Sequence, residues 1–360
     1  MPGLEETFPM ARKIPVAVVG ATGLAGQQFL ASLAGHPWFE VTALAASGRS
    51  VGKTYRDACN WNISHDIPPK AAEMVVQDCK PGLDCELVFS ALPAEIAGAI
   101  EEDFAQAGYK VSSNSRNHRM DPDVPLLIPE VNPGHIEIIP HQRRNRGWKT
   151  GFIVTNPNCS TIHMVMALKP MDDEFGLAKV MVTTMQALSG AGYPGVASLD
   201  SLDNVVPYIG GEEEKMESEP LKLLGRIEND SFVFADMVVS AQCNRVAVRD
   251  GHTECVSVEL KRKAGLDEVI AALRDFKGRP QELQLPSAPA RPIVVRAESD
   301  RPQPKFDRDD EKGMASVVGR VRKCPILDYK FVVLGHNTIR GAAGAAILNA
   351  ELLKACGYIG

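Results

Sequence analysis

The feature that most constrains this chain is a glycine-rich turn near its N-terminus. The apolar, β-rich run Ile14 to Val19 stops at the segment Gly20-Ala-Thr-Gly23-Leu-Ala-Gly26, and residues 24 to 33 have helical composition. Glycines at such a turn let the backbone approach a pyrophosphate, which the free N–H groups of the helix N-terminus can bind. An ordinary strand-to-helix turn is the alternative, but the position directly after the first strand favours a dinucleotide site.

The residues after the second predicted strand indicate which dinucleotide binds. This strand, Val41 to Ala46, is followed by Ser47-Gly48-Arg49-Ser50, without the acidic residue that usually binds the ribose 2′-hydroxyl of NAD. Hydroxyl and guanidinium donors suit a 2′-phosphate, so we expect NADP(H); a solvated loop is the alternative. The expected contacts in this region are Gly20, Thr22, Gly23, Leu24, Ala25, Gly26, Ser47, Arg49 and Ser50.

The order of predicted elements indicates an α/β chain with two domains. Strands and helices alternate up to about residue 155, which predicts βαβ units and a doubly wound Rossmann-type sheet. Longer β-rich stretches then follow, among them Val180 to Gln186, Phe232 to Val248 and Thr253 to Leu260, which predicts a mixed sheet. We expect an NADP-binding domain over 1–157, completed by a C-terminal helix over 338–360, and a catalytic and dimerisation domain over 158–337.

Composition and charge exclude several classes of protein. The net charge of −6 argues against a nucleic-acid-binding surface, and no apolar run is long enough to span a bilayer. Residues 1 to 13 lack the continuous apolar core of a signal peptide, so a cytoplasmic location is expected. The eight cysteines form no C-x-x-C pair, and we expect no metal site.

One cysteine has a setting suited to nucleophilic chemistry. Cys159 lies in Asn156-Pro157-Asn158-Cys159-Ser160-Thr161, between an apolar strand and a probable helix. A helix N-terminus stabilises a thiolate and offers backbone donors to a neighbouring oxyanion. A buried structural cysteine is the commoner alternative. Of the histidines that could move a proton, His252 has a slight advantage over His163, because it lies at a turn that enters a strand.

Several motifs in the same order carry a resemblance to a known family. They are the glycine turn, the PNCST segment, Gln186 in TTMQALSGAG, the run EEEKMESEPLKLL from Glu212, Asn244-Arg245-Val246 followed by Gly251-His252, and Asn337 in NTIRGAAG. Together they resemble aspartate-semialdehyde dehydrogenases, and more closely the archaeal and fungal branch than the branch of many bacteria. The resemblance runs from Val16 to the C-terminus and implies an architecture like that of glyceraldehyde-3-phosphate dehydrogenase.

The resemblance also implies roles for individual residues. Cys159 would be the acylated nucleophile, His252 the acid/base catalyst and Gln186 an orienting residue. The implied substrate contacts are Arg245 for the α-carboxylate, Glu219 for the ammonium group, Lys222 and Arg119 for the phosphate, with Arg116 as a possible second phosphate contact, and Asn158. Further cofactor contacts are Ser90, Ser189, Gly190 and Asn337, the last at the nicotinamide. Without the resemblance, Glu219 and Lys222 would be read as a surface pair on a helix.

The implied reaction reduces β-aspartyl phosphate with NADPH to aspartate semialdehyde and phosphate through a cysteine thioester. It belongs to threonine and methionine biosynthesis and, in some organisms, to lysine biosynthesis. Related reductases of N-acetylglutamyl phosphate or malonyl-CoA are alternatives, as are a cysteine hydrolase and a non-catalytic NADP-binding sensor. The family is usually dimeric or tetrameric, so a homodimer or homotetramer is expected.

Overall fold

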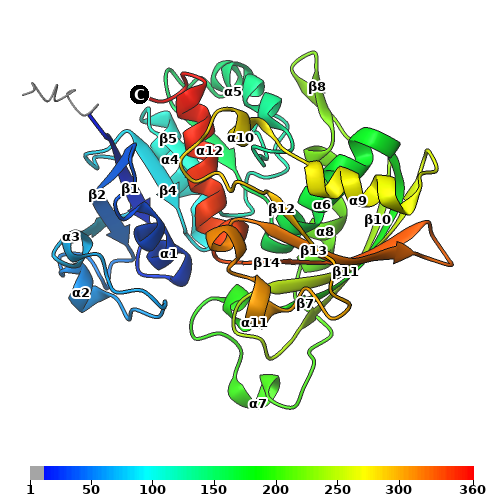
Figure 1. The fold of residues 1–360 in the computed structure, drawn as a ribbon. Helices are drawn as coiled ribbons and strands as arrows, with labels where there is room; N and C mark the ends of the chain where they lie inside the picture. Colours follow the sequence, from blue (N-terminus) through cyan, green and yellow to red (C-terminus); the bar gives the residue numbers. More distant parts are fainter. Residues whose placement is uncertain (1–11) are drawn as a thin grey trace, which may run out of the picture.

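The computed structural model describes residues 12–360, which form two six-stranded sheets with helices packed against them (Figure 1). The first sheet is entirely parallel, with the strand order β3-β2-β1-β4-β5-β6. Its strands are β1 (Ile14–Val19), β2 (Phe39–Ala46), β3 (Val76–Asp78), β4 (Leu87–Ser90), β5 (Lys110–Ser113) and β6 (Phe152–Thr155). The predicted α/β class and doubly wound first sheet are confirmed.

Helices cover both faces of the parallel sheet. The long helices are α1 (Leu24–Leu33), α4 (Ala94–Gln106), α5 (Ile139–Arg146) and α12 (Gly344–Ala355), and the short ones are α2 (Tyr55–Ala58) and α3 (Pro69–Ala72). Side chains of α1 and α12 share one apolar core with β1, whereas α4 packs into a separate core on the other face. The C-terminal helix therefore packs against the N-terminal sheet, and Ser112 Oγ donates to the Ala346 carbonyl at 3.1 Å.

The second sheet is mixed, with the order β10-β7-β11-β14-β13-β12. Its strands are β7 (Leu177–Gln186), β10 (Val238–Arg245), β11 (His252–Leu260), β12 (Ile293–Arg296), β13 (Ser316–Lys323) and β14 (Tyr329–Gly335). One prediction was wrong in detail. The stretch predicted as one strand over 232–248 contains the end of β9 (Ser231–Val233), which forms a hairpin with β8 (Arg226–Glu228), and then β10, while residues 246–248 lie in no strand.

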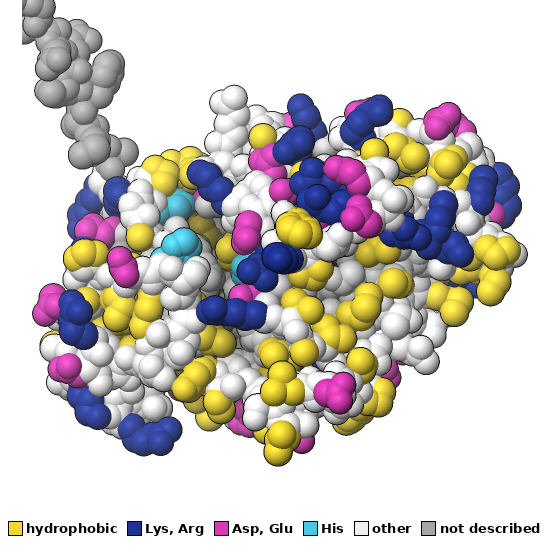
Figure 2. All heavy atoms as spheres, turned by 60° about the horizontal axis from the view of Figure 1, so that its bottom comes forward, with side chains coloured by type: hydrophobic (Ala, Val, Ile, Leu, Met, Phe, Trp, Pro, Cys, Tyr) yellow, Lys and Arg dark blue, Asp and Glu magenta, His cyan; other side chains and the backbone are white. Residues whose placement is uncertain are grey.

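The helices of the second half cover one face of the mixed sheet. They are α6 (Cys159–Phe175), α8 (Glu212–Leu223) and α9 (Leu266–Asp275), with short helices α7 (Ser198–Ser201), α10 (Arg279–Glu282) and α11 (Pro304–Asp307) in the connections. Apolar side chains outside the core include Met181 on β7, Val238 on β10 and Leu199 on α7. Figure 2 shows hydrophobic side chains spread over this side of the molecule. No helix within 12–360 is both long and apolar enough to cross a membrane.

The carboxyl ends of the parallel strands bring distant segments together. Ser90 pairs with Val19 and with Ser113, and Ser113 pairs with Thr155, so β1, β4, β5 and β6 end at one level. The glycine turn, the segment 114–124 and the start of α6 therefore leave the sheet from the same edge, where ligands of open parallel sheets bind. The two sheets take their strands from 14–155 and 177–335, which is compatible with the proposed domain boundaries.

Candidate active site

Cys159 is the first residue of α6, and the sequence immediately before it ends the strand and caps the helix. The Asn158 side-chain oxygen accepts hydrogen bonds from the backbone N–H groups of Ser160 at 2.9 Å and Thr161 at 3.2 Å. This N-cap fixes the first turn of the helix and so the position of the Cys159 side chain. Gly341 packs against that side chain, and a Cβ added there would lie 2.8 Å from Cys159 Cβ.

His252, and not His163, faces the cysteine. His252 Nε2 lies 3.1 Å from Cys159 Sγ, whereas the His163 ring is fully buried and contacts Ser316 Oγ at 2.9 Å. The Ala187 N–H donates to His252 Nδ1 at 3.0 Å, so the neutral ring carries its proton on Nε2, toward the sulfur. Burial, together with the charges of Arg245 and His336, lowers the pKa of His252 to about 3. At neutral pH the ring is therefore an uncharged donor to the sulfur.

The environment of Cys159 favours the protonated thiol in the ligand-free protein. Burial raises the pKa of Cys159 to about 12, and the negative charge of Glu212 acts in the same direction. Lys215, Arg119 and Arg245 oppose this shift. The sequence had led us to expect a thiolate stabilised by the helix N-terminus, but burial outweighs that effect here. Ionisation of the sulfur therefore depends on the balance between one anion and three cations around it.

Glu212, which the sequence reasoning missed, lies at the centre of a polar cluster beside the cysteine. It is the first residue of α8 and is 5% exposed. Its Oε1 accepts hydrogen bonds from Asn158 Nδ2 at 2.7 Å and Gln186 Nε2 at 3.1 Å, and its Oε2 pairs with Lys215. Burial alone would raise the pKa of Glu212, but Lys215 and these donors hold it below its usual value. The carboxylate is therefore a fixed negative charge next to Cys159.

The structure does not leave Glu219 and Lys222 free for a substrate. The Glu219 oxygens accept from Arg119 Nη1 at 2.8 Å and from the Asn158 N–H at 2.7 Å. Lys222 Nζ donates to the carbonyls of Arg119, Asp121 and Val124, each at 2.8 Å, which uses all three of its N–H groups. Lys222 thus has no N–H left for a phosphate in this structure, while the Glu219 carboxylate is held by two donors. The assignment of these two residues as the phosphate and ammonium contacts stays a prediction.

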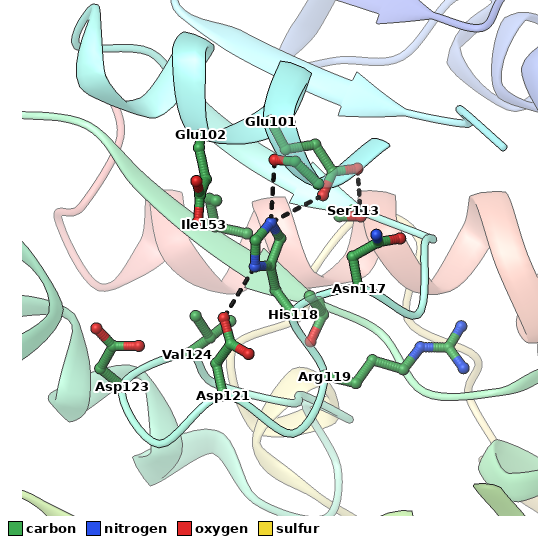
Figure 3. A network of polar contacts seen from close by, with 12 residues as sticks. Glu101, Glu102, Ser113, Asn117, His118, Arg119, Asp121, Asp123, Val124 and Ile153 are labelled. Atoms are coloured by element: carbon green, nitrogen blue, oxygen red, sulfur yellow. Dashed lines mark hydrogen bonds and ion pairs between the residues drawn. The ribbon is translucent and has the colours of Figure 1, made fainter. Parts of the chain in front are cut away.

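Arg119 differs from Lys222 because it keeps unused donors. Besides the bond to Glu219, its Nη2 donates to the Asn114 carbonyl at 2.8 Å, and its buried Nε finds no partner among residues 12–360. Figure 3 shows the Arg119 side chain leaving the segment in another direction from His118, the residue before it. Arg116 is exposed, and its Nη1 lies 3.4 Å from the place of a Cβ on Gly211, directly before α8.

Arg245 reaches the site from the end of β10. It pairs in register with Gln186 at the end of β7 and is 7% exposed, and its Nη1 donates to the Ala187 carbonyl at 2.8 Å. Gly190 lies against it. A Cβ at Gly190 would lie 2.8 Å from Arg245 Nη1 and 3.3 Å from His252 Nε2, so a side chain there would displace both groups.

The glycine turn has the geometry that a pyrophosphate requires. Gly20 has φ +76°, and a Cβ there would lie 2.5 Å from the Ala91 carbonyl oxygen, whereas a Cβ on Gly26 would strike the Gly20 carbonyl at 2.4 Å. Gly23 precedes α1 and provides no side-chain cap, so the first N–H groups of α1, including those of Leu24 and Ala25, stay available. These residues therefore fit a dinucleotide.

The other expected cofactor residues lie in the loop after β2 and along a cavity beside α1. Ser47 and Arg49 are exposed at the end of β2, next to the glycine turn, while Ser50 is buried in the same loop. A cavity of about 560 Å³ lies between Leu24 on α1 and Ser189 of the second domain, and Thr338 also lines it.

Three expected cofactor contacts, Asn337, Ser189 and Ser90, already have partners within the protein. Asn337 Nδ2 donates to Ser189 Oγ at 2.8 Å, and its Oδ1 accepts from the Gly251 N–H at 2.8 Å. The Ser90 hydroxyl donates to Glu101 at 2.5 Å, so it faces a carboxylate instead of the cleft. Among the expected contacts, Ser90 is thus the one whose hydroxyl is already directed elsewhere.

The fold and the site together define a class of enzyme: a dinucleotide-dependent dehydrogenase with a cysteine in contact with a histidine. The sequence matches two family models, "Semialdehyde dehydrogenase, NAD binding domain" over residues 15–139 and "Semialdehyde dehydrogenase, dimerisation domain" over residues 168–340. The chain belongs to the aspartate-semialdehyde dehydrogenase family, and the resemblance found in the sequence is confirmed.

Relatives in the archaeal and fungal branch carry this conclusion. The aspartate-semialdehyde dehydrogenase of Archaeoglobus fulgidus is 55% identical over 340 residues, which cover 94% of this chain and 97% of the relative. That of Candida albicans is 47% identical over 354 residues, with coverage of 94% and 97%. A crystal structure of the aspartate-semialdehyde dehydrogenase from Candida albicans with NADP has a TM-score of 0.89 and 45% identity, covering 97% of this chain and all of that one.

Proposed function

We propose that the enzyme reduces β-aspartyl phosphate with NADPH to aspartate semialdehyde and phosphate, within aspartate-family amino-acid biosynthesis. The observation that carries the proposal is the 3.1 Å contact between Cys159 Sγ and His252 Nε2 at the N-terminus of α6, next to a dinucleotide cleft. The names of relatives at 45–55% identity support the substrate, and the relative solved with NADP supports the cofactor.

In the first step Cys159 attacks the acyl carbon, a thioester forms and phosphate departs with the thiol proton. His252 holds the developing thiolate through its Nε2–H. The Cys159 N–H can stabilise the oxyanion, whereas the N–H groups of Ser160 and Thr161 already donate to the Asn158 side chain. NADPH, when bound, supplies the hydride that reduces the thioester. As the resulting adduct collapses to the aldehyde, His252 again donates to the departing sulfur.

The tautomer of His252 limits what it can do alone. Its Nδ1 accepts from Ala187, so Nε2 already carries a proton and acts as a donor. To accept the thiol proton, the ring would have to move its own proton to Nδ1 and lose the Ala187 bond. We therefore assign the neutral His252 ring the role of a hydrogen-bond donor that stabilises the thiolate, because release of its only ring proton would leave an imidazolate. The acid/base role that the sequence suggested stays a prediction.

The charges around Cys159 match the ends of the substrate. We propose that Arg245 binds the α-carboxylate, because its guanidinium can form a bidentate pair beside His252. Glu212 would face the ammonium group, and Gln186 and Asn158, which bond to Glu212, would orient the substrate. Arg119 and Lys215 would bind the phosphate, and the exposed Arg116 could add a further contact.

The rival functions differ in what they require from these residues. A reductase of malonyl-CoA would not need the buried Glu212 carboxylate, because its substrate carries no ammonium group. N-acetylglutamyl phosphate likewise has its nitrogen acylated and uncharged. A cysteine hydrolase would not need the dinucleotide cleft, and a non-catalytic sensor would not need the Cys159–His252 pair.

We also propose a homodimer or homotetramer that acts in the cytoplasm. The match to a dimerisation domain over 168–340 supports association. The mixed sheet exposes Met181 and Val238 on the face opposite α6 and α8, and the nearby 199–208 segment exposes Leu199 and Tyr208. Exposed apolar side chains gathered on one face are typical of a surface that a second copy covers.

A coupled assay tests the proposed reaction. NADPH formation would be followed with aspartate semialdehyde and phosphate, with succinic semialdehyde as the control substrate without an ammonium group. We expect turnover that requires phosphate and prefers aspartate semialdehyde. Equal turnover of succinic semialdehyde, or faster NADPH consumption with malonyl-CoA, would assign the enzyme to one of the rival reductases.

A further inference from the structure

Helix α8 carries two Glu-x-x-Lys pairs, seven residues apart. They are Glu212 with Lys215 and Glu219 with Lys222. Seven residues span nearly two turns, so both pairs face the same side of the helix, about 10 Å apart along its axis. The first pair lies beside Cys159, whereas the second lies under the segment 114–124, which carries Arg119.

The Lys222 ammonium is enclosed by the backbone of that segment. Its three donors reach the carbonyls of Arg119, Asp121 and Val124 at 2.8 Å each, and the Phe232 ring centroid lies 4.3 Å from Nζ. The side chain is buried, with 1% of the residue exposed. Three carbonyls around one point suit a compact tetrahedral cation and do not match the planar fork of an arginine. Lys222 therefore fixes the path of residues 119 to 124.

Glu219 connects the same segment to the nucleophile. One of its oxygens accepts from Arg119 Nη1 at 2.8 Å, and the other accepts from the backbone N–H of Asn158, the residue before Cys159, at 2.7 Å. The carboxylate is buried, so both bonds lie in a region of low dielectric constant, where they are strong. The Arg119 guanidinium is thus tied to the start of α6 by a single bridging side chain.

Helices α4 and α5 contact the other side of the segment 114–124. Figure 3 shows His118 between Glu101 of α4 and Asp121. Its Nδ1 lies 2.9 Å from Asp121 and its Nε2 lies 3.3 Å from the Gly98 carbonyl and 3.9 Å from Glu101. Arg146 of α5 also pairs with Asp121, at 2.7 Å. The segment is therefore fixed from α4 and α5 on one side and from α8 on the other.

We propose that Lys222, together with Glu219, is a positioning residue that sets the Arg119 guanidinium relative to Cys159 and so acts on the phosphate without touching it. The proposal rests on the proposed function, because Arg119 is taken as a phosphate contact. It gives a role to Lys222, which has no free donor and lies seven residues after Lys215 on the same side of α8. It also gives the second Glu-x-x-Lys pair a role distinct from that of the first.

The test is a double-mutant cycle in the full-length enzyme with both co-substrates varied. Lys222→Met should raise the KM for phosphate about tenfold, within the usual range of coupling between neighbouring residues, and change the KM for aspartate semialdehyde about twofold at most. In an Arg119→Ala background, Lys222→Met should have no further effect on the phosphate KM, because its effect passes through Arg119. Lys215→Met is the matched control, and it should raise the phosphate KM further in the Arg119→Ala background, because its contact with phosphate does not pass through Arg119.

Two results would overturn the proposal. One is an effect of Lys222→Met that adds fully to that of Arg119→Ala, and the other is an unchanged phosphate KM in Lys222→Met. A wild-type enzyme without phosphate-dependent turnover would instead refute the proposed function.

A second measurement avoids variants that fail to fold. Amine-modifying reagent applied to the wild-type enzyme should label Lys215 less when phosphate is present and leave Lys222 unlabelled with or without phosphate. Phosphate protection of a reactive Lys222 would show direct contact and overturn the proposal.

Discussion

Removal of the Glu212 charge should have two opposite effects on the active site. Glu212→Gln keeps the size of the side chain and one acceptor oxygen for Asn158 and Gln186 but removes the negative charge beside Cys159. Loss of one partner from a desolvated charge pair costs about 2 to 5 kcal/mol, and each 1.4 kcal/mol is a factor of ten. The kcat/KM for aspartate semialdehyde should therefore fall by about 30- to 4,000-fold.

The same substitution should make the cysteine more reactive. Glu212 raises the pKa of Cys159, so its removal lowers that pKa and increases the thiolate fraction at a given pH. Alkylation of Cys159 by iodoacetamide should accelerate in Glu212→Gln, although turnover slows. A general structural defect would not be expected to slow turnover and at the same time shift the pH profile of alkylation to lower pH.

The assay combines alkylation rates over a pH series with kinetics on two aldehydes. Succinic semialdehyde has no ammonium group, so its kcat/KM should change far less than that of aspartate semialdehyde, and the preference between the two should shrink. An unchanged preference would refute the placement of the ammonium beside Glu212. If the pH dependence of the alkylation rate were the same in Glu212→Gln and in the wild type, the electrostatic effect of Glu212 on Cys159 would be refuted.

Three further predictions concern the cofactor, the carboxylate and acid stability. Ser47→Asp combined with Arg49→Ala should weaken NADP binding far more than NAD binding in fluorescence titrations, because it places a like charge against the 2′-phosphate; equal losses would place the phosphate elsewhere. Arg245→Lys should lower kcat/KM for the aldehyde by about 2 to 4 kcal/mol with little change in the phosphate KM, since lysine cannot form the bidentate pair; a matching rise in the phosphate KM would indicate one shared anion site. Burial lowers the pKa of His135 to about 4 from 6.5, so between these values the unfolded chain binds more protons and stability falls as the pH falls. In urea titrations, the free energy of unfolding should fall by about 2 kcal/mol less between pH 7 and pH 5 in His135→Gln than in the wild type. An equal fall in both proteins would show that His135 does not cause the loss of stability in acid.

The parts of the fold that follow from local patterns could be read from the sequence. The glycine turn after β1 lies where the sequence predicted, and a helix follows the PNCST segment as expected, although the cap at Asn158 was not predicted. The division of the 232–248 stretch could not be read in this way. Apolar residues such as Phe234 and Met237 continue the pattern between the two strands, although pairing with β7 begins only at Val238.

The substrate pocket shows why residue roles are harder to predict than elements. Glu219 with Lys222 and Glu212 with Lys215 have the same spacing and the same helix face, so helical periodicity gives no reason to choose between them. The role of each pair depends on which segments lie opposite that turn of α8. Asn158 and Gln186 contact Glu212, whereas the backbone of residues 119–124 contacts Lys222. The repeated Glu-x-x-Lys was the available signal that a second candidate pair existed.

The reactivity of Cys159 likewise depends on contacts between distant segments. The start of a helix is visible in the sequence, but the burial that raises the thiol pKa and the approach of Glu212, Arg119 and Arg245 are not. The tautomer of His252 depends in the same way on the Ala187 N–H, which the end of β7 places opposite Nδ1.

The most direct test of the account is to trap the acyl enzyme on Cys159. Mixing the enzyme with aspartate semialdehyde and NADP in the absence of phosphate should give a burst of about one NADPH per site and a thioester that cannot be released as acyl phosphate. Peptide mass spectrometry should find the β-aspartyl adduct on Cys159 and on none of the other seven cysteines, and added phosphate should remove it. An adduct on a different residue, or a burst that persists in Cys159→Ser, would contradict the account.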